Sequence, residues 1–169
     1  MQEEIIFSKS IKNKASELIG FLDIKNALSK YGEVHFVGSY NTDLMTNNDL
    51  DIDVVTNSKR QSAIDFLNEM ISTQKVQKIQ FGDFENHPRT NRPHDYIVVL
   101  ILDFEWQRWE VEVWFKEAED LEKKRLEDSL MKLPEDIKIK IIKDKIERDK
   151  SSDKHKTSSF DIYSKYINL

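Results

Sequence analysis

The chain has 169 residues, of which 38% are hydrophobic, 34% charged and 10% aromatic. This length suits one domain with a hydrophobic core, and the aromatic content argues against a disordered chain. The net charge of −5 gives no positive field that would attract a long polyanion, so the composition argues against broad binding of nucleic acid.

The sequence contains no cysteine, which excludes disulfides, zinc–thiolate sites and a thiol nucleophile. Residues 1–4 lack the basic start and the long apolar run of a signal peptide. The longest apolar run, 96–102, is too short to cross a bilayer. We therefore expect a cytoplasmic protein that does not span a membrane.

The first predicted element is a helix over 8–30, because its apolar residues recur at helical spacing and Gly32 follows as a stop signal. Next, β-branched and aromatic residues predict strands at 34–37 and 50–55, and a second helix is expected at 59–71.

Three more strands are predicted in the middle of the chain, at 75–81, 96–102 and 108–115. The strand at 96–102 is continuously apolar and the strand at 108–115 alternates, and the short connection at 103–107 favours a hairpin of these two. The segment 82–93, which precedes this hairpin and contains His-Pro-Arg and Asn-Arg-Pro, is predicted to be a loop.

From residue 116 onward the sequence is densely charged and helical in pattern. Pro134 suits the first position of a new helix that ends near Lys150. A polar break at 151–153 follows, and then a short helix around 160–167 that could pack on the core.

The predicted fold class is α+β, with a short mixed sheet of about five strands and the helices from 8–30 and 59–71 on one face. We expect one domain, in which 1–115 is the catalytic core and 116–169 is a C-terminal helical segment of that same domain.

The most informative motif is Gly38-Ser39 at the end of the first predicted strand. The glycine allows another group to approach the backbone closely, and a helix that begins here would direct N–H groups and a serine hydroxyl at phosphate oxygens. The motif therefore predicts an anion-binding turn.

The next strand carries Asp49, Asp51 and Asp53, which share one face because side chains alternate along a strand. Three carboxylates so close together repel one another, and bound divalent cations would remove that penalty. Magnesium is the expected ion, since it prefers oxygen ligands and keeps several water molecules.

Two magnesium ions can activate a hydroxyl and stabilise a leaving pyrophosphate during in-line displacement at phosphorus. Such a site normally needs a further carboxylate from a neighbouring strand. Glu110 and Glu112 are the candidates, on one face of the strand predicted at 108–115.

These residues resemble the signature of the DNA polymerase β-like nucleotidyltransferases, in which an apolar residue, Gly and Gly or Ser precede a spacer of about ten residues and an acid-apolar-acid motif. The resemblance implies that Gly38 and Ser39 hold the nucleotide triphosphate. It also implies that Asp51 and Asp53 bind two catalytic magnesium ions, with Glu112 as third ligand and base.

Two alternatives stay open within this resemblance. Asp49 with Asp51 would satisfy the same spacing, and Glu110 could replace Glu112. Asp51 with Asp53 is the preferred pair, because Val54 and Val55 then continue the strand directly after the second acid.

The implied reaction transfers a nucleoside monophosphate from a nucleoside triphosphate, with ATP as the expected donor, to a hydroxyl and releases pyrophosphate. The expected acceptor is a small molecule, such as an antibiotic, or a protein, with no long nucleic acid and no membrane involved. The alternative hypothesis is a catalytically inactive nucleotide- or partner-binding module, such as the antitoxin-like half of a toxin–antitoxin pair.

Overall fold

The computed structural model describes residues 3–90, 92–151 and 157–167. Its centre is a five-stranded sheet in the order β1-β2-β5-β4-β3, in which β2 and β5 are parallel and the other neighbours antiparallel. The strands are β1 Glu33–Val37, β2 Asp49–Val55, β3 Lys78–Asp83, β4 Tyr96–Phe104 and β5 Gln107–Lys116. The mixed five-stranded sheet predicted from the sequence is confirmed.

The last two strands form the predicted hairpin, but its connection is shorter than 103–107. The register continues to the pair Phe104 and Gln107, which leaves two turn residues, Glu105 and Trp106. Both have positive φ, 49° and 63°, as the two central residues of a type I′ turn require.

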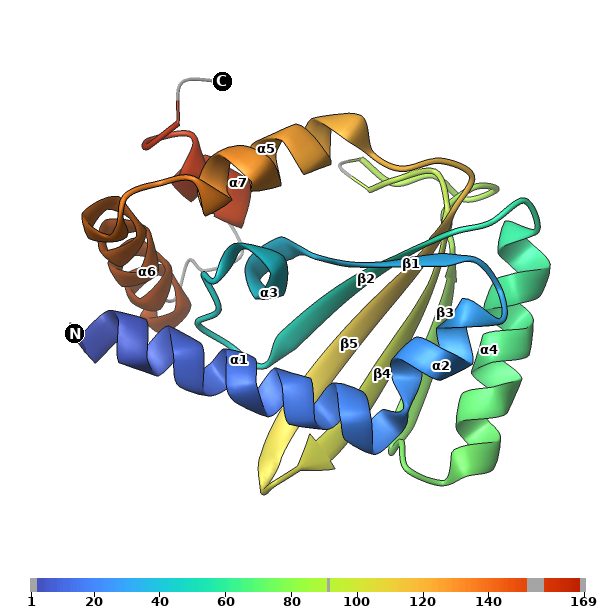
Figure 1. The fold of residues 1–169 in the computed structure, drawn as a ribbon. Helices are drawn as coiled ribbons and strands as arrows, with labels where there is room; N and C mark the ends of the chain where they lie inside the picture. Colours follow the sequence, from blue (N-terminus) through green and yellow to red (C-terminus); the bar gives the residue numbers. More distant parts are fainter. Residues whose placement is uncertain (1–2, 91, 152–156, 168–169) are drawn as a thin grey trace.

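One face of the sheet is covered by α1 (Glu3–Leu22), α2 (Ile24–Ser29) and α4 (Lys59–Thr73), which share the main hydrophobic core with it (Figure 1). The single helix predicted at 8–30 is wrong in extent. It begins at Glu3 and breaks at Asp23, whose φ of 52° is left-handed, so that α2 turns toward the sheet.

The C-terminal helices α5 (Leu121–Met131), α6 (Glu135–Lys150) and α7 (Ser159–Tyr163) form a second hydrophobic cluster, which also takes in Ile5 of α1 and Leu44. Pro134 directly precedes α6, and α6 ends at the predicted residue. The predicted polar break at 151–153 lies mostly outside the described residues. Figure 1 shows α6 beside the start of α1 and close to α3 (Gly38–Thr42).

None of the helices in the described part of the chain combines the length and the apolar character that a bilayer crossing would need.

Candidate active site

The Gly38-Ser39 turn connects β1 to the short helix α3. Gly38 has a φ of 68°, a left-handed conformation that favours glycine. A Cβ atom added at Gly38 would also clash with the carboxylate of Asp51. Glycine therefore allows the turn to lie directly against the Asp51 side chain.

The acidic residues of two neighbouring strands meet beside this turn. In the parallel pairing of β2 with β5, Asp49 lies opposite Glu110 and Asp51 opposite Glu112. These four side chains line one cavity of about 270 Å³. The cavity is also lined by Ser39, Asn47, Lys145, Arg148 and Ser159.

The environment of Asp49 and Asp51 opposes the ionisation of their carboxyl groups. Burial raises the pKa of Asp51 to about 7, and the Glu112 carboxylate adds to the rise while Lys123 opposes it. Asp49 keeps exposed surface, yet the chain packed around it raises its pKa to about 6, with further contributions from Glu110 and Glu112. The cavity is thus a place where added positive charge would be favourable.

Asp53, the predicted partner of Asp51, has a different environment. Its Oδ2 accepts hydrogen bonds from Lys116 Nζ at 2.9 Å and Lys123 Nζ at 3.3 Å, and 8% of its side chain is exposed. It lines a separate cavity, under α5, together with His35.

The pairing of β1 explains this separation. β1 pairs with β2 only from Asp51 onward, so that Asp53 lies beside His35 inside the sheet, whereas Asp49 lies beyond the end of β1. The structure brings Asp49 and Asp51, the alternative pair that the spacing allows, into the cavity of Ser39, and leaves Asp53 neutralised by lysines outside it.

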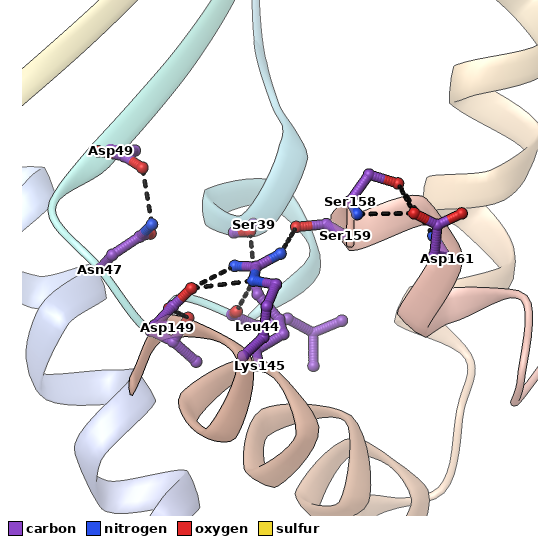
Figure 2. A network of polar contacts seen from close by, with 11 residues as sticks. Ser39, Leu44, Asn47, Asp49, Lys145, Asp149, Ser158, Ser159 and Asp161 are labelled. Carbon is purple, nitrogen blue, oxygen red and sulfur yellow. Dashed lines mark hydrogen bonds and ion pairs between the residues drawn. The ribbon is translucent and has the colours of Figure 1, made fainter. Parts of the chain in front are cut away.

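Lys145 of α6 is a site residue that the sequence did not single out. It is 1% exposed, and its ammonium donates to Ser39 Oγ at 2.6 Å and to the Leu44 carbonyl at 2.7 Å (Figure 2). Its only signal in the sequence is its place three and four residues after the buried Ile142 and Ile141, on the apolar face of a helix.

Arg148 is one turn further along α6 and also reaches the cavity. Its guanidinium donates to Asp149 Oδ1 at 2.7 Å and to Ser159 Oγ at 2.9 Å. Together with Lys145, it places two cationic side chains in the lining of the cavity that Ser39 shares.

A further carboxylate holds the Gly38-Ser39 turn from the other side. Glu127 of α5 is 6% exposed and accepts hydrogen bonds from Gly38 N at 2.6 Å and from Asn41 Nδ2 at 2.7 Å. The C-terminal segment thus fixes the first turn of α3, a role for which the sequence carries no motif.

The donor atoms of the cavity fit magnesium. Asp49, Asp51, Glu110 and Glu112 offer only carboxylate oxygens, and the raised pKa values of Asp49 and Asp51 are consistent with a lack of neutralising charge around those two side chains. Among the described residues, no three His, Cys, Asp or Glu side chains are gathered closely enough to enclose a metal alone. Magnesium suits such an open set, since water and phosphate oxygens usually complete its coordination.

No family model and no curated protein matches the sequence, but several solved structures match the fold. The Cid1 poly(U) polymerase bound to Mg and 3′-dATP has a TM-score of 0.58 at 19% identity, over 87% of this chain and 48% of its own. The poly(A) polymerase complex GLD-2–GLD-3 matches with a TM-score of 0.60 at 14% identity, over 96% and 57%. A cytoplasmic RNA terminal U-transferase matches with 0.55 at 20% identity, over 88% and 45%.

This chain has the nucleotidyltransferase fold. The fold expected from the Gly-Ser and acidic motifs is therefore confirmed. The chain spans about half the length of these matched structures.

Proposed function

We propose that this chain is a nucleotidyltransferase that moves a nucleoside monophosphate from a nucleoside triphosphate to an acceptor hydroxyl. The observation that carries the proposal is that Asp51 lies against the Gly38-Ser39 turn and opposite Glu112, in one cavity with two cationic side chains. Phosphate-binding and cation-binding groups thus share one site in a nucleotidyltransferase fold.

The triphosphate is bound, in this proposal, by the cationic side of the cavity. Ser39 offers its hydroxyl, and Lys145 and Arg148 offer charged donors next to it. Lys145 already donates to Ser39 Oγ, and an incoming phosphate oxygen would take the place of that neutral partner. These side chains would contact the phosphates and not the base, so they are compatible with ATP or another nucleoside triphosphate.

Asp49 and Asp51 are the proposed magnesium ligands, with Glu112 as the third carboxylate. Asp53 is replaced in this role by Asp49, because the two lysines bound to Asp53 already neutralise its charge. When bound, magnesium supplies the positive charge that the developing pyrophosphate and the attacking oxygen require.

The chemistry of the transfer is a single displacement at the α-phosphorus. The acceptor oxygen forms a bond to the α-phosphorus, and the bond from that phosphorus to the α–β bridging oxygen breaks. The electron pair leaves with pyrophosphate, and the hydroxyl proton passes to the Glu112 carboxylate and from there to water.

The matched structures change the acceptor that we expect. The sequence favours a small-molecule or protein acceptor, whereas the matched structures are poly(U) and poly(A) polymerases and an RNA terminal U-transferase. We therefore propose a nucleic-acid hydroxyl as the first acceptor to test.

The decisive experiment compares three single substitutions in a pyrophosphate-release assay with each of the four nucleoside triphosphates, magnesium and a short RNA. We expect Asp49→Asn and Asp51→Asn each to lower turnover by at least about 100-fold, since removing a group that acts on the transition state typically costs this much. Asp53→Asn should retain much more activity, because Asp53 binds lysines and not the substrate.

A large loss for Asp53→Asn in a protein that remains folded, with activity retained in Asp49→Asn, would instead restore the pair Asp51 and Asp53. Magnesium-dependent binding of nucleotide by the wild type without any pyrophosphate release would favour the inactive binding module.

A further inference from the structure

A second cavity, of about 710 Å³, adjoins the proposed triphosphate cavity on the same face of the sheet. Glu110 and Glu112 line both cavities. The remaining lining comes from β3, from β4 and from the segment between them. The carboxylates therefore lie where the two cavities meet, so that a molecule in the larger cavity would face the phosphates in the smaller one.

The wall of the larger cavity carries aromatic rings and two guanidinium groups beside the carboxylates of Asp83, Glu110 and Glu112. The Phe84 ring stacks on the Trp114 ring, with centroids 5.8 Å apart and planes inclined by 28°. The Arg89 guanidinium lies 5.5 Å from the centre of the Phe84 ring. Arg92 adds a second guanidinium, 3.8 Å from Glu112 Oε2.

The floor of this cavity is apolar. Ile97 and Val99 of β4 point to the same face as Trp114 and form with it a small hydrophobic cluster, against which Phe84 packs. Gly82 makes this packing possible, because a Cβ atom there would lie 2.6 Å from Ile97 Cγ2 and 3.2 Å from the Phe84 ring.

Arg89 is not needed to neutralise the protein itself. It is exposed, and within the described residues it has no carboxylate partner, its contact being with the Phe84 ring. The protein has a net charge of −5, yet this guanidinium lies beside an aromatic ring and an apolar floor. Such a combination offers a local site for a ligand that is both planar and anionic.

We propose that this groove binds the 3′-terminal nucleotide of a single-stranded nucleic acid. The terminal base packs on the Phe84 ring over Ile97 and Val99, and Arg89 and Arg92 contact the adjacent backbone phosphate. The terminal hydroxyl then lies toward Glu112. This assignment rests on the proposed function, since the groove is an acceptor site only if the triphosphate occupies the cavity of Ser39.

Size and charge support a terminal nucleotide over other acceptors. A volume of about 710 Å³ accommodates a ligand of one or two nucleotides, and the net charge of −5 gives no general attraction for a long strand. Arg89 and Arg92 provide the donors that a backbone phosphate needs, beside the carboxylates of Asp83, Glu110 and Glu112.

The test measures binding without any transfer. A 5′-fluorescent single strand of about eight nucleotides is titrated with the protein and followed by anisotropy at low salt, with no nucleoside triphosphate present. RNA and DNA strands of the same sequence form two arms, which show whether the sugar is distinguished.

We expect Phe84→Ala and Arg89→Ala each to weaken binding by at least about fivefold, since the first removes the ring on which the base packs and the second removes a phosphate donor. Phe84→Tyr, which keeps the ring, should bind within about twofold of the wild type. Arg125→Ala removes the same charge from exposed α5, away from the groove, and should leave binding unchanged.

Undetectable binding of both strands by the wild type, or equal losses for Arg89→Ala and Arg125→Ala, would overturn the groove assignment. The outcome is separable from that of the proposed function. If Phe84→Ala and Arg89→Ala do not change pyrophosphate release, the proposed transferase activity stands and the groove assignment is rejected. If both substitutions weaken strand binding but the wild type releases no pyrophosphate, the groove stands as a binding site and the proposed activity is rejected.

Discussion

Asp51 and Asp53 are two residues apart on one strand, yet their negative charges have opposite consequences for folding. Asp51 is surrounded by carboxylates, which together with burial raise its pKa to about 7. Asp53 is bound to two lysines, of which Lys116 is itself buried. The negative charge of Asp51 is therefore costly in the folded protein, whereas that of Asp53 is paired with two lysine ammonium groups.

This contrast predicts the pH dependence of stability. A carboxyl whose pKa rises from 3.8 unfolded to about 7 folded favours the folded state while it is protonated, and that contribution is lost as pH rises through about 7. Asp51→Asn does not titrate. We therefore expect it to melt close to the wild type near pH 4 and several degrees higher at pH 8 in the absence of magnesium, at roughly 2–4 °C per kcal/mol.

Thermal unfolding of both proteins at several pH values measures this difference. Asp53→Asn is the matched control of opposite sign, since it leaves buried Lys116 without its charged partner and should lower stability by about 3–5 kcal/mol. A lower melting temperature for Asp51→Asn at pH 8 would contradict the account of the acidic cavity.

At the scale of elements, α5 determines the shape of the turn that precedes α3. Two donors of this turn, Gly38 N and Asn41 Nδ2, point to the two oxygens of Glu127. Since α3 has only five residues, it contributes little stability of its own. The contact with α5 is what holds the Gly38-Ser39 turn against Asp51.

Glu127→Ala should therefore destabilise the protein by about 2 kcal/mol, because it leaves two partly buried donors without an acceptor. It should also raise the KM for nucleoside triphosphate more than it lowers kcat, since Glu127 positions the turn and does not touch the substrate. Urea unfolding and steady-state kinetics measure the two effects. Glu147→Ala, on the exposed face of α6, is the control and should change stability by less than about 0.5 kcal/mol.

A loss of kcat with unchanged KM and unchanged stability in Glu127→Ala would argue against a positioning role for this residue.

At the scale of the whole molecule, the prediction of one domain, with 116–169 as part of it, remains to be tested. Polar contacts link the C-terminal helices to the sheet region, among them Lys123 with Asp53, Glu127 with Gly38, and Lys145 with Ser39. In addition, Ile5 and Leu44 pack into the hydrophobic cluster of these helices. Such connections predict that the two parts unfold together.

The three tryptophans allow a direct measurement, because Trp106, Trp109 and Trp114 all lie in or next to β5. Ile142 of α6 is fully buried, so Ile142→Ala should cost about 2–4 kcal/mol. We expect the unfolding midpoints from tryptophan fluorescence and from far-ultraviolet circular dichroism to fall by the same amount. A fluorescence midpoint that stays at the wild-type value would show that the C-terminal helices unfold separately.

The local sequence pattern was sufficient to predict much of the fold of this protein. Alternation along 49–53 put the three aspartates on one face, an apolar run located β4 and alternation located β5. The Gly-Ser motif marked the turn that the structure places against Asp51. These features depend on residues close together in the chain, where backbone geometry alone fixes which side chains share a face.

The tertiary structure decided which carboxylates share a cavity with Ser39. Spacing admits both Asp49–Asp51 and Asp51–Asp53, and the difference comes from the length of β1 and from two lysines more than 60 residues away along the chain. Lys145 and Glu127 reach the turn from 106 and 89 residues away. Contacts at such separations depend on how helices pack on the sheet, so no motif in a single sequence encodes them, whereas the strand, the turn and the row of acids were determined by the sequence itself.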